Sequence, residues 1–274
     1  MLTPIMRPIL QPVLVPVDYE YGDGDDPMRL FAGGKKGYLF DFLDRSTLFQ
    51  DTAGTIPALA IGDPVALALD KSGNGNHLVL TTATKRPLVS VDGLAFDGID
   101  DCFVTIGAVD TGGSESVAVF YGGEYEASAS YEIIVEASPA AYAGTFYLVR
   151  SFPSTPPNRV ARRVTGPVSS TISSPADTAD TPPTKSVLAF LGRVTQGNTR
   201  SDLYFNGALR ETATPDLGVT DPFANYLHYV GCRNQNTFFY KGTMTSLACV
   251  FKECTDNEVK AMSRYINNRM GGVY

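Results

Sequence analysis

The sequence predicts an all-β fold: an antiparallel sandwich of two sheets, preceded by an extended N-terminal arm and followed by a short helix. Two observations support this prediction. Short runs rich in Val, Phe and Tyr recur along the chain between Gly, Asn, Pro or Asp residues, which is typical of many short antiparallel strands. Near the C-terminal end the apolar residues change to helical spacing. The expected strands are 116–122, 131–137, 145–151, 186–194, 201–209 and 245–251.

Proline occupies every fourth position at the start of the chain, at Pro4, Pro8, Pro12 and Pro16. Proline fixes its own φ and pushes the preceding residue toward an extended conformation, so a helix is excluded here. A secretory signal is not expected either, because proline interrupts every apolar run. In a strand the four missing N–H donors would share one edge, so this segment could pair along its other edge only.

The arm is also strongly apolar. Burying its eight aliphatic or Met side chains would contribute about 12–24 kcal/mol, whereas ordering about fifteen residues costs about 15–30 kcal/mol. These two contributions nearly cancel. Because proline already restricts the free segment to extended conformations, the ordering cost is reduced, and this favours docking of the arm on another subunit. The alternative is a first strand of this chain's own core. The expected assembly residues are Pro4, Ile5, Pro8, Ile9, Leu10, Pro12, Val13, Leu14 and Pro16.

The domain organisation follows from these patterns. Residues 1–35 are expected to be the arm and an acidic linker that includes EYGDGDDP (20–27), for which a calcium-binding loop is the alternative. Residues 36–274 are expected to form the sandwich. Within it, 164–186 is rich in Ser, Thr and Pro and nearly free of large apolar groups, which predicts a long surface loop.

Composition excludes two classes of partner. Only 19% of residues are charged and the net charge is −7, which argues against nucleic acid, since binding phosphates needs clustered positive charge. The basic cluster Arg159, Arg162 and Arg163 is interpreted as a solvated strand face. No run approaches the ~20 apolar residues of a membrane-spanning helix.

The four cysteines form no metal-binding or redox motif. Cys102, Cys232, Cys249 and Cys254 include no C-x-x-C pair, and no nearby His completes a zinc set. With no export signal, all four are expected to be reduced, and a disulfide is the alternative if the protein works outside a cell.

A helix is predicted after residue 254. Thr255 and Glu258 form a capping box, and Gly271 and Gly272 provide the stop. The residues at helical spacing are Val259, Met262, Ile266 and Met270. This amphipathic pattern predicts a helix that packs against the sandwich.

Several segments resemble one fold family. LDKSGNGNHLVL (69–80) and GLAFDGIDDCFVTI (93–106) resemble laminin-G-like, concanavalin-A-like jelly rolls. SDLYFNGALRETA (201–213) resembles the hairpin of that family, and 238–262 resembles its closing strands and helix. Residues 41–77 are similar to the segment that opens such domains in tailed-bacteriophage virion proteins, where a Pro-rich N-terminal tract is also common. The resemblance implies a concanavalin A-like jelly roll used for binding or assembly.

The resemblance also implies a candidate calcium site, because several laminin-G-like domains hold a structural Ca²⁺ near strand ends. The candidate ligands are Asp70, Asp97 and Asp100, with Asp101 beside them. The alternative is that these acids only form turns. No other cofactor is expected.

No catalytic residues are expected, and the chain is predicted not to be an enzyme. Some relatives of this fold hydrolyse glycans with paired carboxylates, but the acids here lack the third member at the required spacing. These acids, Glu124, Glu126, Glu132 and Glu136, are interpreted as solvated carboxylates at strand ends. His77 and His228 have no nucleophile beside them in the sequence. Tyr226, Tyr229 and Tyr240 could suggest a sugar platform, but core positions are the preferred interpretation.

The predicted function is a bacteriophage virion structural protein, a head decoration or another surface-exposed component that the arm anchors to neighbouring capsid or tail subunits. The alternative is a host-surface glycan-binding module of a tail or fibre, and a glycan hydrolase is a distant third. The expected partners are other virion proteins, further copies of the chain in a homo-oligomer and, under the alternative, a host glycan. The expected location is the virion, assembled in the host cytoplasm.

Overall fold

A computed structural model describes residues 25–126, 131–137, 145–150, 159–165, 168–174, 184–215 and 221–274. The predicted assembly residues, from Pro4 to Pro16, lie outside this part of the chain.

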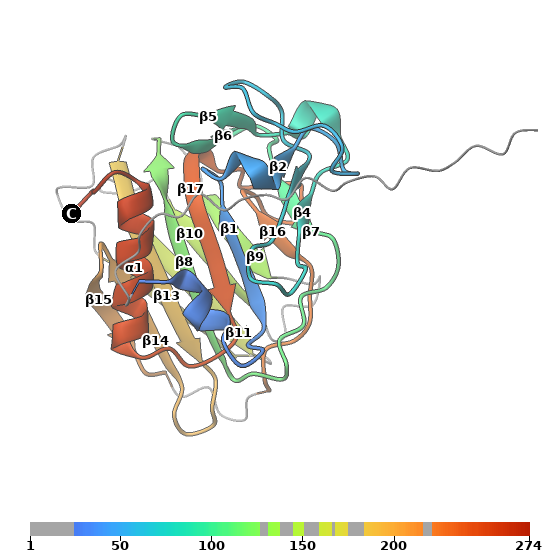
Figure 1. Ribbon diagram of the computed structural model, residues 1–274. Helices are drawn as coiled ribbons and strands as arrows, with labels where there is room; N and C mark the ends of the chain where they lie inside the picture. The colour runs from blue at the N-terminus through green and yellow to red at the C-terminus, as the bar shows by residue number, and fades with distance from the viewer. Residues whose placement is uncertain are drawn as a thin grey trace, which may run out of the picture.

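The described residues form two antiparallel sheets that face each other (Figure 1). In the first sheet the strand order is β15-β14-β13-β8-β17-β6-β5, and β1 pairs with β17 beside β6. The second sheet has the order β12-β11-β10-β9-β16-β7-β4-β3-β2. The predicted all-β sandwich with a C-terminal helix is therefore confirmed.

The bounds of the elements are as follows. The first, eight-stranded sheet contains β1 (Gly37–Asp41), β5 (Leu88–Ser90), β6 (Gly93–Asp97), β8 (Ser116–Tyr125), β13 (Thr184–Arg193), β14 (Arg200–Phe205), β15 (Ala208–Ala213) and β17 (Lys241–Val250). The second, nine-stranded sheet contains β2 (Leu48–Phe49), β3 (Leu67–Ala68), β4 (Leu78–Val79), β7 (Phe103–Thr105), β9 (Glu132–Ala137), β10 (Thr145–Arg150), β11 (Arg159–Thr165), β12 (Val168–Ser174) and β16 (His228–Val230). The helices are α1 (Asp256–Arg269) and the 3₁₀ turns η1 (Pro27–Phe31), η2 (Arg45–Thr47) and η3 (Ala83–Lys85).

The central strands of the eight-stranded sheet are buried on both faces, because α1 and η1 form a third layer over part of its outer face. Along β8, Val119 and Tyr121 pack into the core between the sheets, while Ala118 and Phe120 pack into a second core under α1 and η1. Figure 1 shows α1 and η1 covering this outer face. A strand buried on both sides has no polar alternation, which explains the continuous apolar run that begins at residue 117.

Helix α1 begins and ends as predicted. The Thr255 side chain accepts from the Glu258 N–H while the Glu258 carboxylate accepts from the Thr255 N–H, and Gly271 and Gly272 follow with φ of +82° and +81°. The helix lies very close to β8, because a Cβ at Gly122 would be 2.1 Å from Cγ2 of Ile266. In the part of the chain described here, no helix has the length and apolar character needed to cross a membrane.

Other local predictions are also confirmed. The hairpin expected at 201–213 turns at Asn206 and Gly207, whose φ values of +49° and +73° suit a tight two-residue hairpin turn. The single strand expected at 201–209 is therefore divided between β14 and β15. The SGNGN turn contains Gly73 and Gly75, again with positive φ. The residues that determine a turn lie within a few positions of one another, so such turns can be predicted from sequence.

Two boundaries differ from the prediction. The predicted loop 164–186 is wrong, because β12 pairs with β11 inside it and β13 already begins at Thr184. An edge strand is held by backbone hydrogen bonds to one neighbour, so the scarcity of large apolar residues did not exclude a strand. Residues 27–31, assigned to the linker, form η1, and Leu30 and Phe31 belong to the second core.

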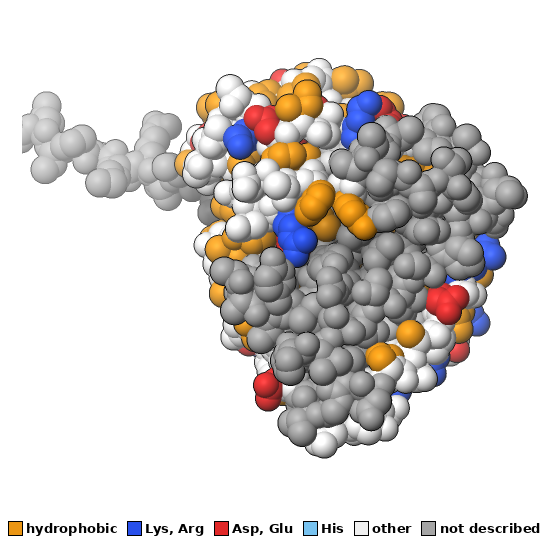
Figure 2. Space-filling view, turned by 180° about the vertical axis from the view of Figure 1, so that it is seen from behind, with side chains coloured by type: hydrophobic (Ala, Val, Ile, Leu, Met, Phe, Trp, Pro, Cys, Tyr) orange, Lys and Arg blue, Asp and Glu red, His pale blue; other side chains and the backbone are white. Residues whose placement is uncertain are grey.

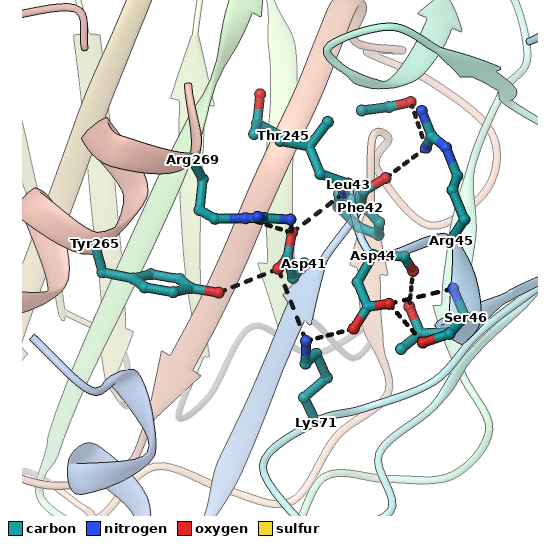
Figure 3. Close-up of polar contacts among 12 residues, drawn as sticks. Asp41, Phe42, Leu43, Asp44, Arg45, Ser46, Lys71, Thr245, Tyr265 and Arg269 are labelled. Carbon is teal, nitrogen blue, oxygen red and sulfur yellow. Dashed lines mark hydrogen bonds and ion pairs between the residues drawn. The ribbon is translucent and has the colours of Figure 1, made fainter. Parts of the chain in front are cut away.

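A buried carboxylate joins α1 to β1 (Figure 3). Asp41, at the end of β1, is 3% exposed. Its Oδ1 accepts from Nη2 of Arg269 at 2.9 Å and from Nε at 3.2 Å, and its Oδ2 accepts from the Tyr265 hydroxyl at 3.2 Å. The ammonium of Lys71 lies 3.7 Å from Oδ2. One carboxylate therefore connects β1, the last turns of α1 and the loop after β3.

The same cluster continues into η2. Lys71 also pairs with Asp44 at 2.6 Å. Burial opposes ionisation of Asp44, but hydrogen bonds from Lys71 and Ser46 outweigh it and lower the pKa of this carboxyl. Beside them, the Arg45 guanidinium donates to the carbonyls of Phe42 and Ser90. These contacts hold the segment after β1 against the turn between β5 and β6.

Two cysteines form a disulfide, so the expectation that all four are reduced is wrong. Cys102 precedes β7 and Cys232 follows β16, and their Cα atoms are 5.4 Å apart although 130 residues separate them in sequence. Strands β7 and β16 are antiparallel neighbours, and this pairing brings the two residues together. Cys249 and Cys254 are free and buried.

His228 lies in the core between the sheets. Its Nδ1 shares a hydrogen bond of 3.0 Å with the Tyr38 hydroxyl, and the rings of Phe146 and Phe251 lie edge-on to it. Nε2 is buried without a hydrogen-bond partner. Burial lowers the pKa of His228 to about 3, so the imidazole stays neutral in the folded protein at neutral pH.

Replacing Asp41 should destabilise the fold strongly. The change Asp41→Ala leaves Arg269 and Lys71 without their buried partner and should lower the free energy of unfolding by about 3–5 kcal/mol. The matched control is Asp110→Ala, because Asp110 forms an exposed ion pair with Lys36 and its loss should cost at most about 1 kcal/mol. Urea unfolding followed by circular dichroism measures both, since the chain contains no Trp. Equal losses in the two variants would contradict the role assigned to Asp41.

The disulfide should be visible as a thiol count and as stability. In denaturant without reductant, two thiols should react with a thiol reagent, and after reduction all four should react. Replacing Cys102 and Cys232 by Ala should lower the free energy of unfolding by about 2–5 kcal/mol, because the crosslink closes a long loop in the unfolded chain. Four reactive thiols before reduction would show that the bond does not form.

His228 should make the protein sensitive to acid. Below the unfolded pKa of about 6.5, the unfolded chain binds a proton that the buried imidazole cannot bind, so stability falls as pH drops toward 3. The loss should be about 1.4 kcal/mol per pH unit, roughly 4–5 kcal/mol over the whole window. Urea unfolding at pH 7, 5.5 and 4.5 measures this effect. The free energy of unfolding should fall less steeply with decreasing pH in His228→Leu than in the wild type. Equal pH dependence in the two proteins would refute the role of His228 in the acid sensitivity.

Candidate polar groove

The candidate functional site is a groove on the outer face of the eight-stranded sheet, just beyond the first turn of α1. Register places Ser116, Arg193 and Arg200 side by side across β8, β13 and β14. The next row toward α1 contains Leu191 and Asp202. Further along, the same face carries the apolar side chains that α1 covers, so the groove opens where the helix stops covering the sheet.

The connection between β17 and α1 forms the wall of the groove. Lys252, Glu253, Thr255 and Asp256 face the strand residues across a pocket of about 230 Å³. This volume is smaller than the roughly 300–1,000 Å³ of pockets for drug-sized ligands. The pocket therefore suits a small polar group such as a single sugar ring.

The charges that line this pocket are balanced and paired. The three cations are Arg193, Arg200 and Lys252, and the three anions are Asp202, Glu253 and Asp256. Nε of Arg200 donates to both oxygens of Asp202, at 2.9 and 2.7 Å. Arg193 pairs with Glu253, and Lys252 pairs with Glu258. The groove thus presents oriented donors and acceptors with no net charge from its lining residues.

Further contacts hold these groups in place. Asp202 also accepts from the Thr212 hydroxyl at 2.6 Å, and Arg193 donates through Nε to the Asn198 carbonyl at 3.0 Å. The Tyr204 hydroxyl donates to Oδ1 of Asp256 at 3.1 Å. Burial first, and the Asp256 carboxylate second, raise the pKa of Tyr204 to about 12, so this phenol stays protonated and remains a donor.

A second, shallower hollow continues from the groove. It shares Ser116, Lys252 and Glu253 with the pocket, has a volume of about 630 Å³, and extends to the Gly33–Lys36 turn and to Thr111. Lys36 pairs with Asp110 at 3.0 Å. The two hollows adjoin at Ser116, Lys252 and Glu253, which line both.

No pattern in the sequence indicated this groove. Its residues come from four separate segments and match no motif. The available signal was the alternation of side chains between the two faces of the predicted strands 186–194 and 201–209. This alternation places Arg193 and Asp202 on the face opposite the core residue Leu203. Sequence alone does not show that these two positions meet the segment after residue 251.

The candidate calcium ligands separate into two places. Asp97, Asp100 and Asp101 place carboxylate oxygens within 4.8 Å of one another. Burial is the main cause that raises the pKa of Asp101 to about 6, with a contribution from the other two acids. Asp97 and Asp101 also accept backbone N–H groups of this turn. Calcium binding by these residues stays a prediction.

Asp70 lies in a different turn and has a structural role. Its carboxylate accepts from the N–H groups of Leu39, Ser72 and Asn76 at 2.8–3.0 Å. His77 accepts from the Asp70 N–H at 3.0 Å. These contacts tie the SGNGN turn to β1, so both Asp70 and His77 form the turn.

The interpretation of the glutamates is partly wrong. Glu132 and Glu136, on β9 between β10 and β16, are fully buried, and Nε of Arg233 lies 3.1 Å from the Glu136 carboxylate. Glu126 is exposed and pairs with Lys241 at 2.9 Å. Of the three tyrosines considered, Tyr240 is in the core as predicted, whereas Tyr226 and Tyr229 are half-buried and lie outside the groove.

Comparison with known proteins shows the fold. No protein-family model matches the chain, and no curated protein matches it. The ligand-binding domain of botulinum neurotoxin serotype D, solved in complex with N-acetylneuraminic acid, superimposes with a TM-score of 0.58 and 9% identity over 87% of this chain and 52% of that one. The receptor-binding domain of botulinum neurotoxin type G superimposes with a TM-score of 0.55 and 8% identity over 84% of this chain and 51% of that one. A structure of botulinum neurotoxin type C, whose cell entry depends on interaction with two ganglioside molecules, superimposes with a TM-score of 0.54 and 9% identity over 84% of this chain and 51% of that one.

The chain therefore spans about half the length of these structures. At 8–9% identity the likeness shows a shared fold and nothing finer. The predicted jelly-roll sandwich is confirmed at this level.

Proposed function

We propose that the chain is a non-catalytic carbohydrate-binding module and that the polar groove takes a sugar ring. The observation that carries this proposal is the set of paired, oriented donors and acceptors along Arg193, Arg200, Asp202 and Glu253. Each sugar hydroxyl is both a donor and an acceptor, so a saccharide needs both kinds of group close together. A single-sign patch would suit an ion instead.

Pre-organisation supports the same conclusion. Asp202 is held by Arg200 and Thr212, and Arg193 is held by Asn198 and Glu253, so little side-chain freedom would be lost on binding. Leu191 offers an apolar surface for the C–H face of a ring. Tyr204 is too buried to act as a stacking platform, which predicts modest affinity for one sugar.

Structural neighbours favour this function over the alternatives. Of the superimposed toxin structures, the serotype D domain is in complex with N-acetylneuraminic acid, and cell entry of the type C toxin depends on interaction with two ganglioside molecules. A glycan hydrolase receives no such support, because Glu132 and Glu136 are buried and Glu126 is engaged with Lys241. The disulfide favours a working location in oxidising surroundings, outside a cell or on a particle surface.

The virion role is a second proposal, which the sequence supports through the resemblance of 41–77 and through the apolar arm. It is compatible with sugar binding, because a glycan-binding module of a tail or fibre is also a virion component. Assembly with capsid or tail subunits and the virion location stay predictions.

Filling the groove should abolish sugar binding. A glycan array probed with the full chain identifies a ligand, and isothermal titration then measures its affinity. Ser116→Trp places a large ring where the two hollows meet and should weaken binding at least tenfold, a loss of about 1.4 kcal/mol or more. Arg200→Gln should also weaken it, because the pair with Asp202 is lost.

The matched control is Lys260→Ala, which changes an exposed cation of α1 outside the groove and should leave the affinity unchanged. Absence of any glycan ligand on the array would refute the proposed function. Unchanged affinity in Ser116→Trp would place the sugar elsewhere on the molecule.

A further inference from the structure

A patch of exposed aliphatic side chains lies at the β5 edge of the eight-stranded sheet. We call it the aliphatic patch, and it consists of five residues that are 44–74% exposed: Leu59, Ile61, Leu88 and Val91 near β5, and Ile56 next to Pro57, which bridges Phe49 of β2. Single exposed aliphatic residues are ordinary, but a group of five on two adjoining segments marks an interaction surface. Figure 2 shows hydrophobic side chains gathered along the upper rim, the end of the molecule that carries β5 in Figure 1.

Hydrogen bonds hold the two segments of the patch together. The N–H of Gly62 donates to the Val89 carbonyl at 2.8 Å, and the N–H of Val89 donates to the Asp63 carbonyl at 2.9 Å. The Asp63 carboxylate accepts from the N–H groups of Leu59 and Ala60 at 3.0 and 2.9 Å. The aliphatic side chains therefore project from a pre-organised backbone, and docking a partner would require little reordering.

These contacts also determine how a partner can bind. The outer edge of β5 is already paired with residues 62–65, including the bridge between Pro64 and Leu88. A partner therefore cannot add a strand at this edge through main-chain hydrogen bonds. It must dock by packing apolar side chains, which suits a proline-rich apolar segment in which every fourth residue lacks an N–H donor.

The chain itself contains such a segment in residues 1–17. This stretch has proline at every fourth position, apolar residues between, and Arg7 as its only charged side chain. The described body begins at Asp25, which pairs with Arg264 on α1 at 2.6 Å, so 24 residues precede that anchor. A chain of this length can extend up to about 80 Å, far enough to reach a neighbouring molecule.

We propose that the aliphatic patch of one copy binds residues 1–17 of a second copy. Each copy carries one arm and one patch, so mutual exchange shelters both apolar surfaces without leaving an unmatched partner. This association is independent of the proposed sugar binding, because none of the patch residues lines the groove.

The test compares the full chain with two charged variants by analytical ultracentrifugation over a range of concentrations. Wild-type protein should self-associate, and the double variant Ile61→Asp with Val91→Asp should sediment as a monomer at the same concentrations. The control is Ile106→Asp, which introduces one such aspartate at an exposed aliphatic residue outside the patch and should associate like wild type. Circular dichroism checks that all three remain folded.

A photo-crosslinker at Leu10 identifies the occupant directly. When a tagged chain carrying it is mixed with untagged chains, the crosslink should join the tagged arm to peptides 56–61 or 88–91 of the untagged chain. A crosslink to the patch of the same chain, association that survives the double variant, or a wild-type chain that stays monomeric at every concentration would each overturn the proposal.

Discussion

The buried carboxylate of Asp41 is the constraint on which the arrangement of the layers depends. It lies at the end of β1 and contacts the last turns of α1 through Arg269 and Tyr265. Such a cluster gains stability only when every charge has a partner, and Asp44 gives Lys71 a second one. Because the contacts are directional, they select one position for α1 along the outer face of the sheet, which apolar packing alone would leave less defined.

The position of α1 in turn creates the groove. The capping box at Thr255 determines where the helix begins, and Gly122 permits its close approach to β8. The row of the sheet under the helix carries Phe120, Ala189 and Tyr204, whereas the rows toward and beyond its first turn carry Asp202, Arg193 and Arg200. The site is thus the uncovered end of a face that is otherwise core, and its polar residues can be exposed without opening the second core.

Local features of this fold could be predicted from sequence, and non-local ones could not. The helix after Thr255 and the turn at Asn206–Gly207 depend on residues within a few positions of one another, and both were predicted correctly. The Cys102–Cys232 bond depends on which strands become neighbours, and the burial of Glu136 depends on long-range packing, so both were predicted wrongly from sequence. The groove was missed for the same reason. Strand β12 was missed differently, because backbone pairing at an edge needs no apolar side chains.

The groove and the aliphatic patch lie at different places on the same sheet, and this separation has a functional consequence. The groove lies over β8, β13 and β14, whereas the patch adjoins β5, with β17 and β6 between them in the strand order. Occupation of one therefore leaves the other accessible. A small polar groove without an exposed aromatic platform binds a single sugar weakly, but copies joined through their patches would present several grooves together. Linked sites of this kind raise avidity by about 10²–10⁴ when their spacing matches the ligand, so self-association would compensate for weak individual binding.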